Sequence, residues 1–159
     1  MSAFEARPPY RAYATILGLY AAGLAGAGAL SRRLERNPQG QTAVDLGVLG
    51  LATFKVARTL SRDSVASFVR EPFVHGDARS GEEEPVRTGG LDEAIGELVT
   101  RARCVGTWAA AALASTQILA PRLGRLLTWS LGAAAVNDFL QAGFAAVTAK
   151  ANKVEERAG

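Results

Sequence analysis

Hydrophobic residues gather in four long stretches of the chain, at residues 12–30, 42–60, 104–120 and 126–149. A helix of about 20 residues crosses the apolar layer of a bilayer, where only helices and closed barrels satisfy every backbone N–H and C=O group. The pattern therefore predicts an all-α, polytopic membrane protein with four transmembrane helices. We expect a single integral membrane domain over residues 1–159.

A charged segment, residues 61–103, separates the second and third stretches. Its beginning can continue the second helix until Pro72, because proline ends helices. Residues 74–90, which include the three glutamates at 82–84, have the composition of a solvated loop. From Leu91, apolar residues recur at helical spacing, which predicts an amphipathic helix on the membrane surface.

The distribution of positive charge predicts the orientation. Four spans place both termini and residues 61–103 on one side, which holds thirteen Lys and Arg residues against five on the other. Because positive residues favour the cytoplasmic side, we expect both termini in the cytoplasm. The mean hydropathy of +0.09 is typical of a soluble chain, but it averages over apolar and charged segments that are separate along the sequence.

The first stretch also has features of a signal peptide. Arg7 and Arg11 precede it, and Ala27-Gly28-Ala29 is similar to a cleavage site. The stretch is nevertheless about 19 residues long, arginines follow it, and three more apolar stretches remain. We therefore expect a retained membrane helix.

Two boundaries of the long helices have a specific chemistry. Thr42 and Asp45 have the spacing of a capping box, so we expect them to begin the second helix. Pro121 is expected to end the third helix, and residues 122–125 would then form a short return to the fourth.

The fourth stretch carries polar residues on part of its surface, namely Asn137, Asp138 and Gln141. A carboxylate in the middle of a bilayer costs about 2.5–3.5 kcal/mol, so Asp138 needs a partner or a function. Counting about 1.5 Å per residue from the start of each helix places Lys55 at a similar depth. The two residues either hold the helices together or belong to a path for ions or protons, and Lys55 can alternatively reach the membrane interface.

The sequence Arg70-Glu71-Pro72-Phe73 has two interpretations. Charged groups at a helix end are suited to recognition of a protein partner. Alternatively, the four residues form a corner at the membrane surface, with Phe73 in the interface and Arg70 near lipid headgroups or Glu97.

The segment Phe68-Val-Arg-Glu-Pro-Phe-Val74 resembles a bacterial family of small membrane proteins, domain of unknown function 1360. Gly96-Glu-Leu-Val-Thr100 and Cys104-Val-Gly-Thr-Trp108 are similar to its second signature. The family usually has a Cys-x-x-Cys pattern there, and Arg101 replaces the first cysteine. The resemblance implies a protein of the bacterial cytoplasmic membrane with undetermined activity, some members being linked to sporulation.

Candidate chemistry is sparse. Cys104 is the only cysteine and His75 the only histidine, which excludes an intrachain disulfide and a Cys/His zinc site within one chain. Cys104 is either a palmitoylated or reactive thiol or a packing residue beside Trp108. No catalytic constellation, phosphate loop or metal-ligand spacing is present, so we expect no enzyme and no cofactor. A net charge of +3 does not favour a nucleic-acid partner.

Two hypotheses follow. The first is an accessory or assembly protein of the membrane that uses residues 61–103 to bind a protein partner or a second copy. The alternative is a small transporter, or an ion- or proton-conducting subunit, that uses the polar face of the fourth helix. An intramembrane enzyme is a third and weaker hypothesis.

Overall fold

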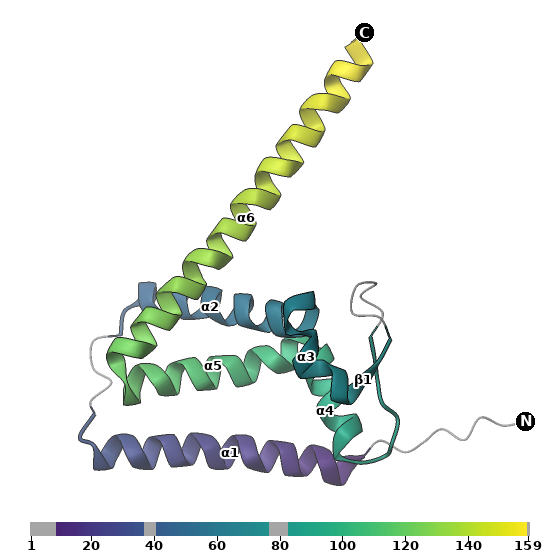
Figure 1. Cartoon of the computed structure of the whole chain (residues 1–159). Helices are drawn as coiled ribbons and strands as arrows, with labels where there is room; N and C mark the ends of the chain where they lie inside the picture. Colours follow the sequence, from purple (N-terminus) through teal and green to yellow (C-terminus); the bar gives the residue numbers. More distant parts are fainter. Residues whose placement is uncertain (1–8, 37–40, 77–82, 159) are drawn as a thin grey trace, which may run out of the picture.

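Four long helices form most of the molecule (Figure 1). The computed structural model describes residues 9–36, 41–76 and 83–158. The predicted all-α class is confirmed, and each apolar stretch corresponds to one long helix. These helices are α1 (Tyr10–Arg33), α2 (Ala43–Arg62), α5 (Ala102–Leu119) and α6 (Pro121–Ala158).

Only α1, among the described helices, is long and apolar enough to cross a membrane by length and composition. Its most apolar part has a mean hydropathy of 1.4, and none of it is buried. Signal sequences and core helices of soluble proteins can have the same composition. Four spanning helices are therefore not supported by this criterion, because Lys55, Asp138 and many small residues lower the hydropathy of the other three.

Helices α2 and α5 pack against each other, and α1 and α6 pack on this pair. Figure 1 shows α1, α5 and α2 side by side, with α1 on the outer side of α5. The first half of α6 packs against α2 and α5, and the helix then leaves them obliquely. From Phe139 to Lys153, every residue of α6 is exposed.

The connection between α5 and α6 differs from the prediction. Proline at 121 begins α6, and residues 122–125 are helical, so α6 is longer at both ends than the predicted range of 126–149. Proline lacks the N–H that a first helical residue leaves unpaired, and its fixed φ suits that position. Gly124 is required here, because a Cβ atom on it would overlap the backbone of Gln117 in α5.

The predicted capping box at the start of α2 is confirmed. The backbone N–H of Asp45 donates to the Thr42 hydroxyl at 3.2 Å, and the backbone N–H of Thr42 donates to the Asp45 carboxylate at 2.9 Å. The sequence therefore determined this boundary.

Residues 61–103 are more ordered than predicted. The second helix does not continue to Pro72, because Asp63 adopts an extended conformation directly after α2. Two short parts of the expected loop also pair as a two-stranded antiparallel ladder, and residues 77–82 lie outside the described part. The elements are η1 (Ser64–Ala66), α3 (Ser67–Arg70), η2 (Glu71–Phe73), β1 (Val74–His75), β2 (Glu84–Pro85) and α4 (Leu91–Thr100).

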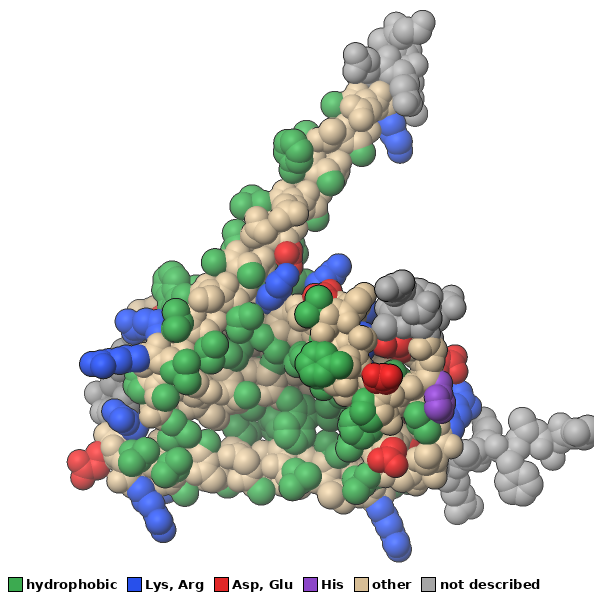
Figure 2. Space-filling view, in the orientation of Figure 1, with side chains coloured by type: hydrophobic (Ala, Val, Ile, Leu, Met, Phe, Trp, Pro, Cys, Tyr) green, Lys and Arg blue, Asp and Glu red, His purple; other side chains and the backbone are tan. Residues whose placement is uncertain are grey.

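Large and small apolar side chains have an unusual distribution. Seven of the ten buried hydrophobic residues among those described are alanines, including Ala52 and Ala135. Large side chains instead face outward, as Leu17 (67% exposed), Leu140 (67%) and Phe144 (75%) do. Figure 2 shows such side chains along α1 and α6. The helices therefore approach one another through small residues.

Candidate functional site

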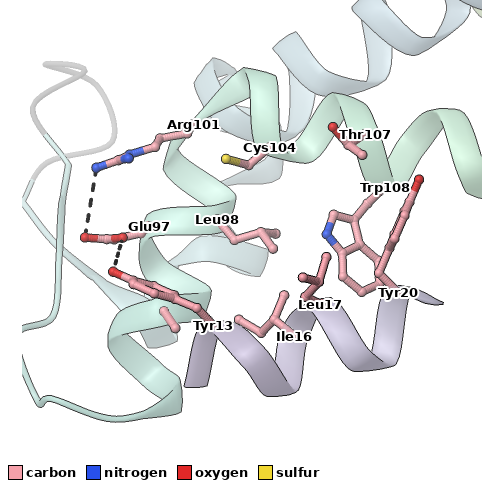
Figure 3. A pocket seen from close by; sticks show the side chains of 11 residues that line it. Tyr13, Ile16, Leu17, Tyr20, Glu97, Leu98, Arg101, Cys104, Thr107 and Trp108 are labelled. Carbon is pink, nitrogen blue, oxygen red and sulfur yellow. Dashed lines mark hydrogen bonds and ion pairs between the residues drawn. The ribbon is translucent and has the colours of Figure 1, made fainter. Parts of the chain in front are cut away.

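A pocket between α1, α4 and α5 brings together residues from distant parts of the sequence (Figure 3). Its volume is about 290 Å³. Tyr13 and Tyr20 line it from α1, which places one residue near each end of the pocket. The other two helices contribute residues that include Glu97, Cys104 and Trp108. Three of the residues selected from the sequence thus meet at one site.

The end of the pocket near α4 is polar. The Tyr13 hydroxyl donates to Glu97 Oε2 at 2.7 Å. The Arg101 guanidinium lies 3.9 Å from the other oxygen of the same carboxylate, and 67% of its side chain is exposed. An exposed pair of this kind contributes about 0–1 kcal/mol, so Arg101 can turn toward another anion at little cost.

The other end is aromatic. The rings of Tyr20 and Trp108 make an edge-to-face contact with centroids 5.2 Å apart. Leu98 and Ile16 line the space between this pair and the polar end. The pocket therefore offers a mainly apolar interior with one acidic and one basic group at its mouth.

Cys104 is exposed and lines the same pocket (Figure 3). The prediction that it lies at a helix start is confirmed, since α5 begins at Ala102. Its modification stays a prediction. Its exposure makes this single thiol a natural chemical label for the pocket.

The predicted partner of Asp138 is found in the structure. Lys55 Nζ donates to Asp138 Oδ2 at 2.7 Å, which joins α2 to α6. Both side chains are partly exposed, at 24% and 36%. Next to the pair, the rings of Phe54 and Phe139 stack with centroids 5.2 Å apart. An ion pair and an aromatic pair at neighbouring positions thus join α2 to α6.

Asn137 and Gln141, the other polar candidates of the fourth stretch, are both exposed on α6. They do not line the pocket described above. The structure therefore brings Lys55 to Asp138 but does not gather all four polar candidates into one cavity.

Arg70 is buried, whereas we expected it either to be available to a protein partner or to lie at the membrane surface. Only 1% of its side chain is exposed, and its Nε donates to Glu83 at 2.7 Å rather than to Glu97 or to solvent. Its Nη1 donates to the carbonyl oxygens of Leu60 at 2.7 Å and Asp63 at 3.2 Å. The guanidinium thus donates to carbonyl oxygens at the C-terminal end of α2. The last C=O groups of a helix have no N–H partner within the helix, so a side chain can bind them. Arg70 is part of the folded interior.

The residues that follow Arg70 form the turn η2. Glu71 and Pro72 are exposed, and Phe73 is half-buried. A Cβ atom on Gly96 would overlap the carbonyl oxygen of Phe73 and approach Pro85, so glycine permits α4 to lie directly on this turn. The two sequence signatures are therefore packed against each other.

Metal binding has no support in the described ranges 9–36, 41–76 and 83–158. No group of three or more His, Cys, Asp or Glu side chains there could hold a metal ion. His75 is exposed in β1.

The sequence did not identify Tyr13, Tyr20 or Leu98 as site residues. The tyrosines are 84 and 88 residues away from their respective partners Glu97 and Trp108 along the chain. The available signal was three tyrosines between residues 10 and 20, and only the packing of α1 on α4 and α5 gives two of them a role.

Comparison with curated proteins and with solved structures gives no match. A family model described as "Protein of unknown function (DUF1360)" matches residues 48–144. The match begins inside α2, includes the elements from η1 to α5 and the first part of α6, and excludes α1. Arg70, Gly96, Cys104 and Trp108 all lie inside it. Because it covers more than half of the chain, the protein belongs to the DUF1360 family of proteins of unknown function.

Proposed function

We propose that this protein is an accessory or assembly protein of the bacterial cytoplasmic membrane, with both termini in the cytoplasm. In this proposal α1, α2, α5 and α6 all lie in the bilayer. Residues 61–103 form its recognition region, and it performs no catalysis.

The observation that carries the membrane assignment is the distribution of apolar side chains. In water, large apolar residues go inside, because their burial contributes about 1.5–3 kcal/mol each. Here the buried positions are mostly alanine, and leucine and phenylalanine face outward from α1, α2 and α6. Helices in lipid gain little from hiding leucine and pack through small residues. Both features are therefore expected of helices that lie in a bilayer, and they support the membrane assignment.

The observation that favours recognition is the pocket between α1, α4 and α5. Glu97, Cys104 and Trp108 come from the family signature, yet Trp108 and Glu97 also hold α1, which lies outside the family match. The pocket is open and combines an apolar interior with charges of both signs at its mouth. These properties suit the insertion of an apolar side chain from a helix of a partner protein.

A site-specific crosslinking experiment tests this function. A photoreactive amino acid at Leu98, which lines the pocket, is expected to give a discrete crosslinked product in intact membranes. The same group at Val44, which is 64% exposed in α2 and lies outside both the pocket and residues 61–103, is the matched control. Trp108→Ala is expected to reduce the product at Leu98. Equal products at the two positions, or none at Leu98, would contradict the recognition role.

Membrane insertion and orientation need a separate test. Carbonate-resistant recovery of the protein in the membrane fraction is expected. In sealed spheroplasts, Cys104 should react with an impermeant maleimide only after lysis, because it lies on the cytoplasmic side in this proposal. Fast labelling from outside would reverse the orientation, and recovery in the soluble fraction would exclude the membrane assignment.

A second candidate function rests on the Lys55–Asp138 pair. Its partial exposure on two helices that we place in the bilayer is suited to a proton or ion path in a conducting subunit. Liposomes containing the purified protein would then show a flux that Asp138→Asn abolishes. A flux that the variant leaves unchanged, or no flux at all, favours a purely structural pair.

A further inference from the structure

A second groove lies between α2 and α5, apart from the pocket just described. Its volume is about 440 Å³. Gly50 lines it from α2 and Gly106 from α5, and a Cβ atom on Gly106 would already come to 3.7 Å from the Ala57 side chain. Phe54, which is 40% exposed, forms part of the apolar wall. The two helices thus approach closely and leave a narrow apolar channel at the surface.

Three arginines line the same groove. Arg58 and Arg62 are one helical turn apart on α2, and Arg103 is in the first turn of α5. All three are exposed. Among the residues that the structure describes, none of these arginines lies within 4.0 Å of a carboxylate oxygen.

This arrangement of positive charges favours an anion. The N-terminus of a helix carries a partial positive charge, and α5 has no acidic residue in its first turn to offset it. Arg103 adds a full positive charge there, and the two arginines of α2 repel it further. An anion between the two helices would relieve this repulsion and accept charge-assisted hydrogen bonds from the guanidinium groups.

We infer that the groove between α2 and α5 binds an anionic phospholipid. Arg58, Arg62 and Arg103 hold its phosphate, and one acyl chain lies along the channel beside Phe54. The continuity of apolar wall and basic rim distinguishes a lipid from free phosphate, which would gain nothing from the wall. The inference rests on the proposed membrane location, and basic pockets between membrane helices are a common type of lipid site.

Native mass spectrometry of the full-length protein from mixed micelles tests the inference. The micelles contain equal amounts of phosphatidylglycerol and phosphatidylcholine, which differ in net charge. The wild-type protein is expected to retain phosphatidylglycerol preferentially. The preference should fall roughly fivefold for each arginine changed to glutamine among Arg58, Arg62 and Arg103. The matched control, Arg32→Gln with Arg33→Gln and Arg122→Gln, removes equal charge elsewhere and should keep the preference.

Equal retention of the two lipids by the wild-type protein overturns the inference, whether or not the variants fold. Loss of preference in the control as well would show a general charge effect and also overturn it. Inorganic phosphate that displaces the lipid preference completely would indicate an anion site without a lipid. Because micelles replace the bilayer, a failure here leaves the membrane assignment standing, whereas recovery of the protein in the soluble fraction removes the assignment itself.

Discussion

The buried Arg70 guanidinium gives the sharpest test of how residues 61–103 fold. Arg70→Ala removes the ion pair with Glu83 and the bonds to the carbonyls of Leu60 and Asp63. Only 9% of the Glu83 side chain is exposed, so its charge would be left without a partner in a site of low polarity. Removing one partner of a buried pair costs about 3–5 kcal/mol.

That cost corresponds to a large shift in melting temperature. For a chain of this size, 1 kcal/mol lowers Tm by about 2–4 °C, so Arg70→Ala should lower it by roughly 6–20 °C. Thermal unfolding of the detergent-solubilised protein, followed by circular dichroism, measures the shift. The matched control is Arg101→Ala, since 67% of that side chain is exposed and its ion pair is long at 3.9 Å. Its expected cost is about 0–1 kcal/mol.

A double-mutant cycle separates the ion pair from the carbonyl contacts. Glu83→Ala alone should be destabilising, because it leaves the buried Arg70 charge unpaired. The double variant should cost at least about 1 kcal/mol less than the sum of the two single changes. If Arg70→Ala is no worse than Arg101→Ala, or if the two changes are additive, then the reasoning is refuted and the Arg70–Glu83 pair does not stabilise the fold.

Three further predictions concern the helix contacts. Gly124→Ala should destabilise the protein by more than about 2 kcal/mol, because the new Cβ overlaps the backbone of α5, whereas Gly143→Ala, where the Cβ meets open space, should be neutral or stabilising by up to about 1 kcal/mol; similar Tm values for the two variants would contradict the tight turn. Thr53→Val should raise the unfolding free energy by about 1 kcal/mol, since the Thr53 hydroxyl is buried and has no hydrogen-bond partner among the described residues, and a lower Tm would show that the hydroxyl is satisfied. Asp138→Leu should destabilise the protein more than Asp138→Leu combined with Lys55→Met, because the single change leaves an unpaired ammonium group; a double variant less stable than the single one would argue against the pair.

Residues 61–103 show why local sequence patterns could not predict the whole fold. The apolar spacing from Leu91 correctly predicted α4, because helix periodicity is a local property. The loop composition of residues 74–90 also predicted no helix, as the structure has it for residues 74–76 and 83–90, but parts of this segment pair as β1 and β2. Those strands depend on Glu83 reaching Arg70 and on Gly96 admitting Phe73, which are contacts between separate elements.

Local chemistry in the sequence determined the all-α class, the four long helices and the capping box at Thr42. It also placed Lys55 and Asp138 at similar distances from the starts of their helices, which predicted that they could pair. Each of these follows from periodicity, from a few neighbouring residues or from the fixed rise of a helix. Tertiary structure alone decided that Arg70 is buried, that Tyr13 bonds Glu97, and that large apolar residues face outward. Those outcomes depend on which helix faces meet, and residues distant along the chain can be neighbours only after the helices have packed.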